Sequence, residues 1–242
     1  MRILAIETAT LMGGVALTSE EGVLAEYRLN VRTTHSEQLM SAVDRVLKSS
    51  HTPLQQIDAF AISIGPGSFT GLRIGLSTVK AFALVTGRPI LPVSTLEALA
   101  NTLPFTTHPI CPLLDAQRGE VYAALFTFLG TNKIRRLGED QVIAPLDLAR
   151  QITQPTILLG NGLNRYGGQL QQSLGEKAIL AARHLWSPSA LQVAELARQQ
   201  WHEGHLPPPS SIVPHYLRRS EAEVKWERRP GTATLNLKGR KR

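Results

Sequence analysis

The sequence predicts an α/β fold made of two similar lobes. Both halves of the 242-residue chain show the order βββαβαβα, with short apolar strands alternating with amphipathic helices, and a glycine-containing turn follows a buried strand in each half. We expect a first lobe over residues 1–104, a second over 105–206 and a basic tail, opened by prolines, over 207–242. Lobes of this kind enclose a cleft.

Three strands open the first lobe. They are expected at 2–8, 14–19 and 23–29, with a hairpin between the last two. Thr34 and Glu37 form a candidate capping box for the helix that follows, which runs to about residue 50. The rest of the lobe is, in order, a strand at 59–64, a helix that ends at Gly87, a strand at 90–93 and a helix opened by Ser94 and Glu97.

The second half repeats this order with weaker signals. The expected elements are strands at 110–115, 121–128 and 133–137, a helix at 146–152, a strand at 156–159, a helix to about residue 174, a short apolar run at 178–181 and a final helix. Ser187 is expected as the N-cap of the final helix, with Pro188 at its first position and Gly204 beyond its end.

The composition is that of an ordinary globular protein, with 43% hydrophobic and 19% charged residues. The N-terminal apolar run is too short for a secretory signal or a membrane span, and no longer apolar segment follows. The single cysteine, Cys111, can form no disulfide within the chain and cannot supply the clustered thiols of a structural zinc site. We therefore expect a cytoplasmic protein that has no membrane partner.

The net charge of +7 is concentrated at the C-terminus. Residues 218–242 hold nine lysines and arginines against three glutamates, so +6 of the net charge lies there. Such a tail can bind the phosphates of RNA by releasing counterions, which suits a protein that works near RNA. The alternative is a solvated chain end without a binding role.

A glycine-rich turn lies between a buried strand and a helix, where unpaired N–H groups and the helix dipole favour phosphate. It lacks the Lys-Ser/Thr pair of a P-loop and the glycine spacing of the dinucleotide fingerprint. The candidate phosphate or nucleotide site combines this turn with the end of the first strand and the glycines of the second lobe: Glu7, Thr8, Gly65, Pro66, Gly67, Gly71, Gly160 and Gly162. The alternative is that these glycines only make turns and allow close packing.

Two copies of βββαβαβα are the layout of the actin, hexokinase and Hsp70 nucleotide-binding superfamily, which is RNase H-like. Moreover, the segments "ILAIETAT", "HSEQLM", "GPGSFTGLRIGLSTVKAFA", "VSTLEALA", "LLDAQRGEVYAALF" and "PHYLR" resemble, in order and position, the bacterial TsaB family. The resemblance covers essentially the whole chain. It implies a subunit that supports TsaD, together with the ATPase TsaE. TsaD transfers threonylcarbamoyl from threonylcarbamoyl-AMP to the exocyclic amine of the adenosine beside the anticodon, in tRNAs that read codons starting with A.

The resemblance also bears on catalysis. TsaD carries two histidines in an "HMEGH"-like segment, four residues apart on one helix face, to hold a metal. The corresponding segment here is "TLEAL", which puts Thr95 and Leu99 at the ligand positions, and the one close histidine pair is His202 and His205. We therefore expect a noncatalytic scaffold without metal or cofactor of its own, with any ATP or ADP in the assembled complex bound mainly by its partners.

The alternative is a small-molecule kinase or ATPase of the same fold. In such enzymes an acidic residue at the end of the first strand helps to hold metal and phosphate, a role that Glu7 could take. A second carboxylate would serve as base, and Asp58 and Asp115 are the nearby candidates. A protease is not expected, because Cys111 has no evident histidine partner.

Two helices of the first lobe carry wide apolar stripes. The resemblance implies that they pair with matching helices of TsaD as a four-helix interface, and that the same surface forms a homodimer when TsaD is absent. The interface residues we expect are Leu39, Met40, Val43, Val46, Leu47, Leu72, Leu76 and Val79. The alternative is that the stripes cover their own sheet.

Overall fold

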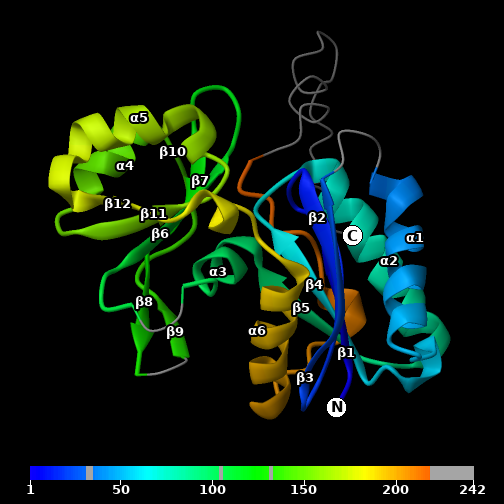
Figure 1. Ribbon diagram of the computed structural model, residues 1–242. Coiled ribbons are helices and arrows are strands. Elements are labelled where there is room, and N and C mark those ends of the chain that lie inside the picture. The colour runs from blue at the N-terminus through cyan, green and yellow to red at the C-terminus, as the bar shows by residue number, and fades with distance from the viewer. Residues whose placement is uncertain (31–34, 104–105, 131–132, 219–242) are drawn as a thin grey trace, which may run out of the picture.

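The computed structural model describes residues 1–30, 35–103, 106–130 and 133–218. Two mixed sheets form the centres of two lobes, with the second lobe at the left of Figure 1. The first sheet has the order β3-β2-β1-β4-β5, and the main path of the second has the order β10-β7-β6-β11-β12. When only the strands of each main path are counted in chain order, both sheets have the order 3-2-1-4-5. This confirms the duplicated α/β fold of the actin-like superfamily.

The first sheet forms as the strand patterns predict. Its strands are β1 (Ile3–Glu7), β2 (Met12–Ser19), β3 (Gly22–Asn30), β4 (Ala59–Gly65) and β5 (Ile90–Ser94). β2 runs antiparallel to β1 and β3, whereas β4 runs parallel to β1 and β5. All five residues of β1 are buried because helices cover both faces of the sheet at its centre.

Helices α1 (His35–Ser49) and α2 (Phe69–Thr86) cover one face of this sheet, and α3 (Thr95–Ala100) and α6 (Ala190–His202) lie on the other. The ends of α2 are fixed by local chemistry: the Ser68 hydroxyl accepts a hydrogen bond from the Gly71 N–H, and Gly87 ends the helix in the left-handed conformation. The expected capping box of Thr34 and Glu37 stays a prediction, because Thr34 falls outside the described residues.

The second sheet contains β6 (Ile110–Asp115), β7 (Val121–Ala123), β8 (Phe126–Leu129), β9 (Lys133–Arg136), β10 (Gln141–Ile143), β11 (Thr156–Leu159) and β12 (Ala178–Leu180). Both β7 and β8 pair with β6, β9 pairs with β8, and β10 pairs with β7. The single strand expected at 121–128 is therefore broken in two. The strand expected at 133–137 is found as β9, and β10 is an additional strand. Helices α4 (Pro145–Gln151) and α5 (Leu163–Leu174) pack together on this lobe.

The last helix corrects the lobe assignment. The sequence places α6 at the end of the second lobe, but the structure packs it against β1 and β2 of the first sheet. Val193 and Ala197 are fully buried there, and Arg198 Nη2 donates a 2.7 Å hydrogen bond to Thr18 Oγ1. Its N-cap is Ser189, two residues later than expected, because the Ser189 hydroxyl accepts from the Gln192 N–H.

Single 3-10 turns occupy Leu54–Gln56, Gly175–Lys177, Arg183–Leu185 and Pro209–Ser211. No helix among the described residues is long and apolar enough to cross a membrane.

Candidate functional site

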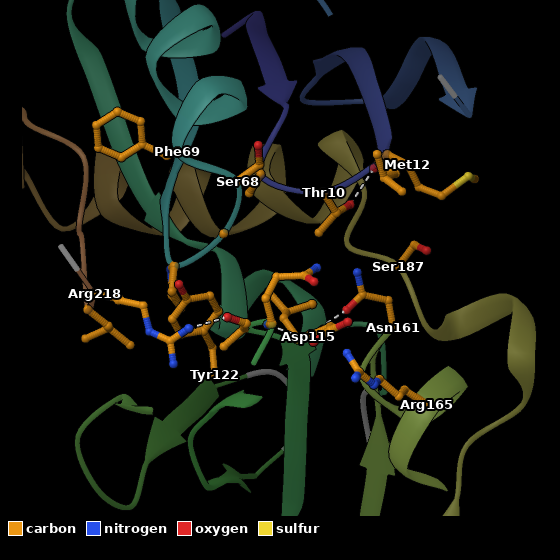
Figure 2. A pocket seen from close by; sticks show the side chains of 18 of the residues that line it. Thr10, Met12, Ser68, Phe69, Asp115, Tyr122, Asn161, Arg165, Ser187 and Arg218 are labelled. Atoms are coloured by element: carbon orange, nitrogen blue, oxygen red, sulfur yellow. Dashed lines mark hydrogen bonds between the residues drawn. The ribbon is translucent and has the colours of Figure 1, made fainter. Parts of the chain in front are cut away.

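A cavity of about 780 Å³ lies between the two lobes. The first lobe contributes the β1–β2 turn with Thr10 and the β4–α2 turn with Ser68. Asp115, Asn161 and Arg165 of the second lobe face these turns, as Figure 2 shows. The cavity is large enough for a ligand of nucleotide size.

Several polar side chains around the cavity are already engaged with the chain itself. Asp115 Oδ1 accepts a 2.8 Å hydrogen bond from the Gln117 N–H, and the Asp115 N–H donates a 2.9 Å bond to Asn161 Oδ1. Arg218 donates to the carbonyl of Ala116 at 2.7 Å and forms an ion pair with Glu120. Asp115 thus stabilises the turn that follows β6.

Glu7 does not line the cavity. It is fully buried, and its Oε1 accepts a 2.6 Å hydrogen bond from the Ala9 N–H. Burial raises the pKa of Glu7 from 4.5 to about 7, although the Ser63 hydroxyl and the N–H groups of Ala9 and Thr10 lower it. The Ser63 hydroxyl lowers the pKa of Glu7. However, neither the Ser63 hydroxyl nor Oε2 of Glu7 forms a hydrogen bond of normal geometry among the described residues. A carboxyl group in this position does not reach a ligand in the cleft.

The glycines of the first lobe are needed for close packing of the chain on itself. A Cβ at Gly67 would lie 2.4 Å from the Ala9 carbonyl oxygen, and one at Gly71 would lie 2.0 Å from that of Thr8. Thr8 also donates from Oγ1 to the Gly71 carbonyl at 2.8 Å, so it joins β1 to the start of α2. Pro66 is buried and lines the cavity.

The glycines of the second lobe also allow close packing of the chain on itself. Gly160 has a φ of 119°, and a Cβ there would lie 2.0 Å from the Leu113 carbonyl oxygen. At Gly162 the added atom would lie 2.9 Å from Leu113 Cδ1. Close packing therefore explains the candidate glycines without a ligand. This supports the alternative that these glycines only make turns and allow close packing. That a phosphate or nucleotide binds here stays a prediction.

The positions that correspond to the metal-binding histidines of TsaD lie in the protein interior. Thr95 and Leu99 are both fully buried on α3. Within the described ranges, no three His, Cys, Asp or Glu side chains come together as a metal site. Asp58, the other candidate base, accepts a 2.7 Å hydrogen bond from the Arg2 N–H at the start of β1. Cys111 is fully buried in the core, which raises the pKa of its thiol to about 12.

The apolar stripes of α1 and α2 mostly cover their own sheet. Six of the eight expected interface residues are at most 6% exposed: Leu39, Val43, Val46, Leu72, Leu76 and Val79. These side chains are therefore covered by the chain itself, as the alternative expected, and that a partner also contacts the two stripes stays a prediction. Met40 is 50% exposed and Leu47 is partly buried. Leu84 and Val85, at the end of α2, are 86% and 78% exposed.

The sequence reasoning missed residues 215–218 as part of the site. They come from the tail that was assigned to residues 207–242, yet they line the cavity. Arg165 and Asn164 of α5 were also missed, since neither belongs to a recognisable motif. The one available signal was the "PHYLR" segment, which stands out from the rest of the tail in the family resemblance.

Comparison with known proteins finds relatives that match most of the chain. The family model for TsaD, tRNA N6-adenosine threonylcarbamoyltransferase, matches residues 22–226. The chain is 31% identical to the tRNA threonylcarbamoyladenosine biosynthesis protein TsaB of Bacillus subtilis, with 93% of this chain and 98% of that protein covered. It is also 31% identical to the TsaB of Escherichia coli K12, with 96% and 99% covered.

Two solved structures have a fold similar to that of this chain. YeaZ from Pseudomonas aeruginosa superposes with a TM-score of 0.77 at 25% identity, over 89% of this chain and 99% of that one. A second structure from the same species, described as an uncharacterized protein with similarity to peptidase YEAZ, has a TM-score of 0.78 at 26% identity, over 90% and 99%. The agreement in sequence and fold runs through both lobes, and the chain belongs to the TsaB family of tRNA threonylcarbamoyladenosine biosynthesis proteins.

Proposed function

We propose that this chain is a noncatalytic subunit in the biosynthesis of threonylcarbamoyladenosine in tRNA. In this role it supports TsaD, the transferase, and acts with TsaE. The observation that carries the proposal is the combination of TsaB family membership with Thr95 and Leu99, two buried residues that cannot hold a catalytic metal, at the positions of the TsaD histidines.

The exposed residues of α1 and α2 are the surface we propose for TsaD. These helices contact each other, and they cover the face of the first sheet that lies opposite α6. Met40 on α1 and Leu84 and Val85 on α2 are exposed apolar side chains, and the burial of such side chains is a main source of binding energy. The same surface would form the homodimer in the absence of TsaD.

We further propose that this chain holds no catalytic nucleotide of its own and that ATP or ADP in the assembled complex is bound mainly by its partners. The burial of Glu7 supports this, because its carboxyl group does not reach the cavity between the lobes. The packing of Gly67, Gly71 and Gly160 against neighbouring carbonyl groups supports it as well.

Reconstitution with purified proteins tests the proposal. Threonylcarbamoyl-AMP and an unmodified tRNA that reads a codon starting with A are incubated with this chain alone, with TsaD and TsaE, and with all three. We expect modified nucleoside only when TsaD is present, and much more of it when this chain is added. Modification by this chain alone would overturn the proposal.

A kinase or ATPase is the second candidate, and the observation in its favour is the cavity of about 780 Å³. It predicts phosphate transfer from ATP by the isolated chain, which Glu7→Gln would abolish. Because Glu7 is buried away from the cavity, we expect no such activity above that of a matched blank preparation.

A further inference from the structure

We propose that residues 212–218 form a latch that holds the two lobes together, with the first lobe providing a docking surface for this segment of its own chain. The segment contains the "PHYLR" motif, which the proposed function leaves without a role. The inference does not depend on TsaD and concerns the chain by itself.

The latch is seated in the first lobe by both side chain and backbone. Ile212 is 4% exposed and belongs to the core cluster under α1 and α2. The His215 N–H donates a 2.7 Å hydrogen bond to the carbonyl of Ile64, near the end of β4. A Cβ at Gly65 would lie 2.6 Å from the His215 carbonyl oxygen. The space beside the glycine turn is thus occupied by the chain's own backbone.

Tyr216 adds a second anchor on the first lobe. Its ring stacks on Phe69 of α2 with centroids 4.6 Å apart and an angle of 27° between the planes. Its hydroxyl accepts a 2.9 Å hydrogen bond from Nε of Arg73, and the Arg73 guanidinium lies 3.8 Å from the centre of the Phe69 ring. Stacking, a cation–π contact and a charge-assisted hydrogen bond together fix this end of the segment on α2.

The next residues reach the second lobe. Arg218 donates to the Ala116 carbonyl at 2.7 Å and forms an ion pair with Glu120, and both partners lie in the β6–β7 turn. His215 Nε2 also lies 3.8 Å from a carboxylate oxygen of Asp140, which precedes β10. Arg218 is three-quarters buried in this position, so its hydrogen bonds are shielded from water more than those of a surface pair.

Seven residues therefore bridge the cleft, anchored by Ile212, His215 and Tyr216 on one side and Arg218 on the other. His215, Tyr216 and Arg218 also line the cavity. The β6–β7 turn cannot move away from α2 while both anchors hold. The lobes also share a hydrophobic core in which α3 packs on β6, and the Tyr216 and Arg218 contacts add to this core on the side of the cavity, where they restrict access to it.

Single-molecule FRET between the lobes tests the latch. The native Cys111 is fully buried, so dyes can be placed on new cysteines at Lys48 and Glu176, which are exposed on the first and second lobes. Measurement at sub-nanomolar concentration keeps the chain monomeric. The variants are Arg218→Ala and Tyr216→Ala, singly and combined. The matched control is Arg150→Ala, which removes an exposed arginine that pairs with Asp147 within α4.

We expect one closed population for the parent protein and for Arg150→Ala. Arg218→Ala removes both the hydrogen bond to Ala116 and the ion pair with Glu120. Because loss of one charge-assisted hydrogen bond alone shifts such an equilibrium by roughly tenfold, this variant should raise the open population by at least that factor, and the double variant by more. Circular dichroism verifies that each variant is folded. If the double variant fails to fold, Arg218→Lys and Tyr216→Phe are measured instead, and the latch predicts a smaller shift in the same direction. A folded variant with an unchanged distance distribution would overturn the proposal.

Discussion

Gly65 and Gly160 hold the same position in the two lobes. Gly65 ends β4 and Gly160 directly follows β11, the strands that lie next to the first strand of each sheet. Their φ angles are 123° and 119°, and in each case a carbonyl oxygen fills the place of a Cβ. The duplication of the fold thus extends to the backbone conformation of single turn residues. This conformation and the close carbonyl oxygen explain why both positions are glycine.

We predict that Gly160→Ala destabilises the protein strongly. The added methyl group would lie 2.0 Å from the Leu113 carbonyl oxygen, and the backbone conformation is one that alanine rarely adopts. Strain and displacement together should lower the free energy of unfolding by about 2–4 kcal/mol. Urea denaturation measures this loss.

Gly168→Ala is the matched control. Gly168 lies within α5, is exposed and has no atom within 4 Å of an added Cβ. Replacing it should raise the stability by about 0.5–1 kcal/mol, because alanine is the better helix former. Equal effects of the two substitutions would contradict the explanation given for Gly160.

The buried carboxyl group of Glu7 should make stability depend on pH. Its pKa is about 7 in the folded protein and near 4.5 when unfolded, so the folded state binds the proton more tightly. The contribution of Glu7 to the free energy of unfolding is therefore most favourable below pH 4.5, declines as the pH rises to 7 and is constant above pH 7. The difference between the two pKa values corresponds to a loss of about 3 kcal/mol in the free energy of unfolding.

Glu7→Gln should remove this pH dependence, leaving a variant that is more stable than the parent protein at pH 8 and similar to it near pH 4.5. Thermal unfolding across this range is the measurement, with Glu176→Gln, an exposed residue, as the control. A variant with the same pH profile as the parent protein would show that Glu7 is not the group responsible.

Binding to TsaD should depend on the exposed residues of α1 and α2. We predict that Met40→Arg or Leu84→Arg weakens the complex at least about thirtyfold, because a charge replaces an apolar contact. Isothermal titration with purified TsaD measures the affinity. Leu146→Arg, at a similarly exposed apolar position on α4, should have no effect.

Val43→Arg and Leu76→Arg, which the sequence alone suggests for the same purpose, should instead unfold the first lobe. Both side chains are at most 6% exposed and pack in the core of the first sheet. Their lower melting temperature would distinguish loss of fold from loss of the interface. An unaltered affinity for TsaD in Met40→Arg and Leu84→Arg would show that the proposed surface is wrong.

The sequence predicted most of the fold because the strands and helices have strong local signals. The strand at Thr156–Leu159 and the left-handed Gly87 were found at the expected residues. The placement of α6 on the first sheet could not be found in this way, because its buried stripe fits either lobe. The break between β7 and β8 and the additional strand β10 arise from pairing that no local pattern reports.

The site was harder to predict because residue type does not reveal burial. An acidic residue at the end of β1 suggests phosphate chemistry, yet Glu7 is turned into the interior. An apolar stripe predicts a buried helix face but does not say whether the same chain or a partner covers it. The role of Tyr216 depends on contacts with Phe69 and Arg73, more than 140 residues earlier in the chain.

Residues 219–242, which hold most of the basic residues of the tail, lie outside the described residues, and their role rests on sequence alone. Residues 228–242 contain six lysines and arginines and no acidic residue. Ending the chain after Glu227 should therefore weaken the binding of tRNA to the assembled complex at low salt. It should also reduce the slope of log affinity against log salt concentration, because fewer counterions are released. Filter binding at several salt concentrations measures both, with a tail of equal length in which serine replaces these six residues as the control. If neither affinity nor slope changes, the tail makes no contact with tRNA.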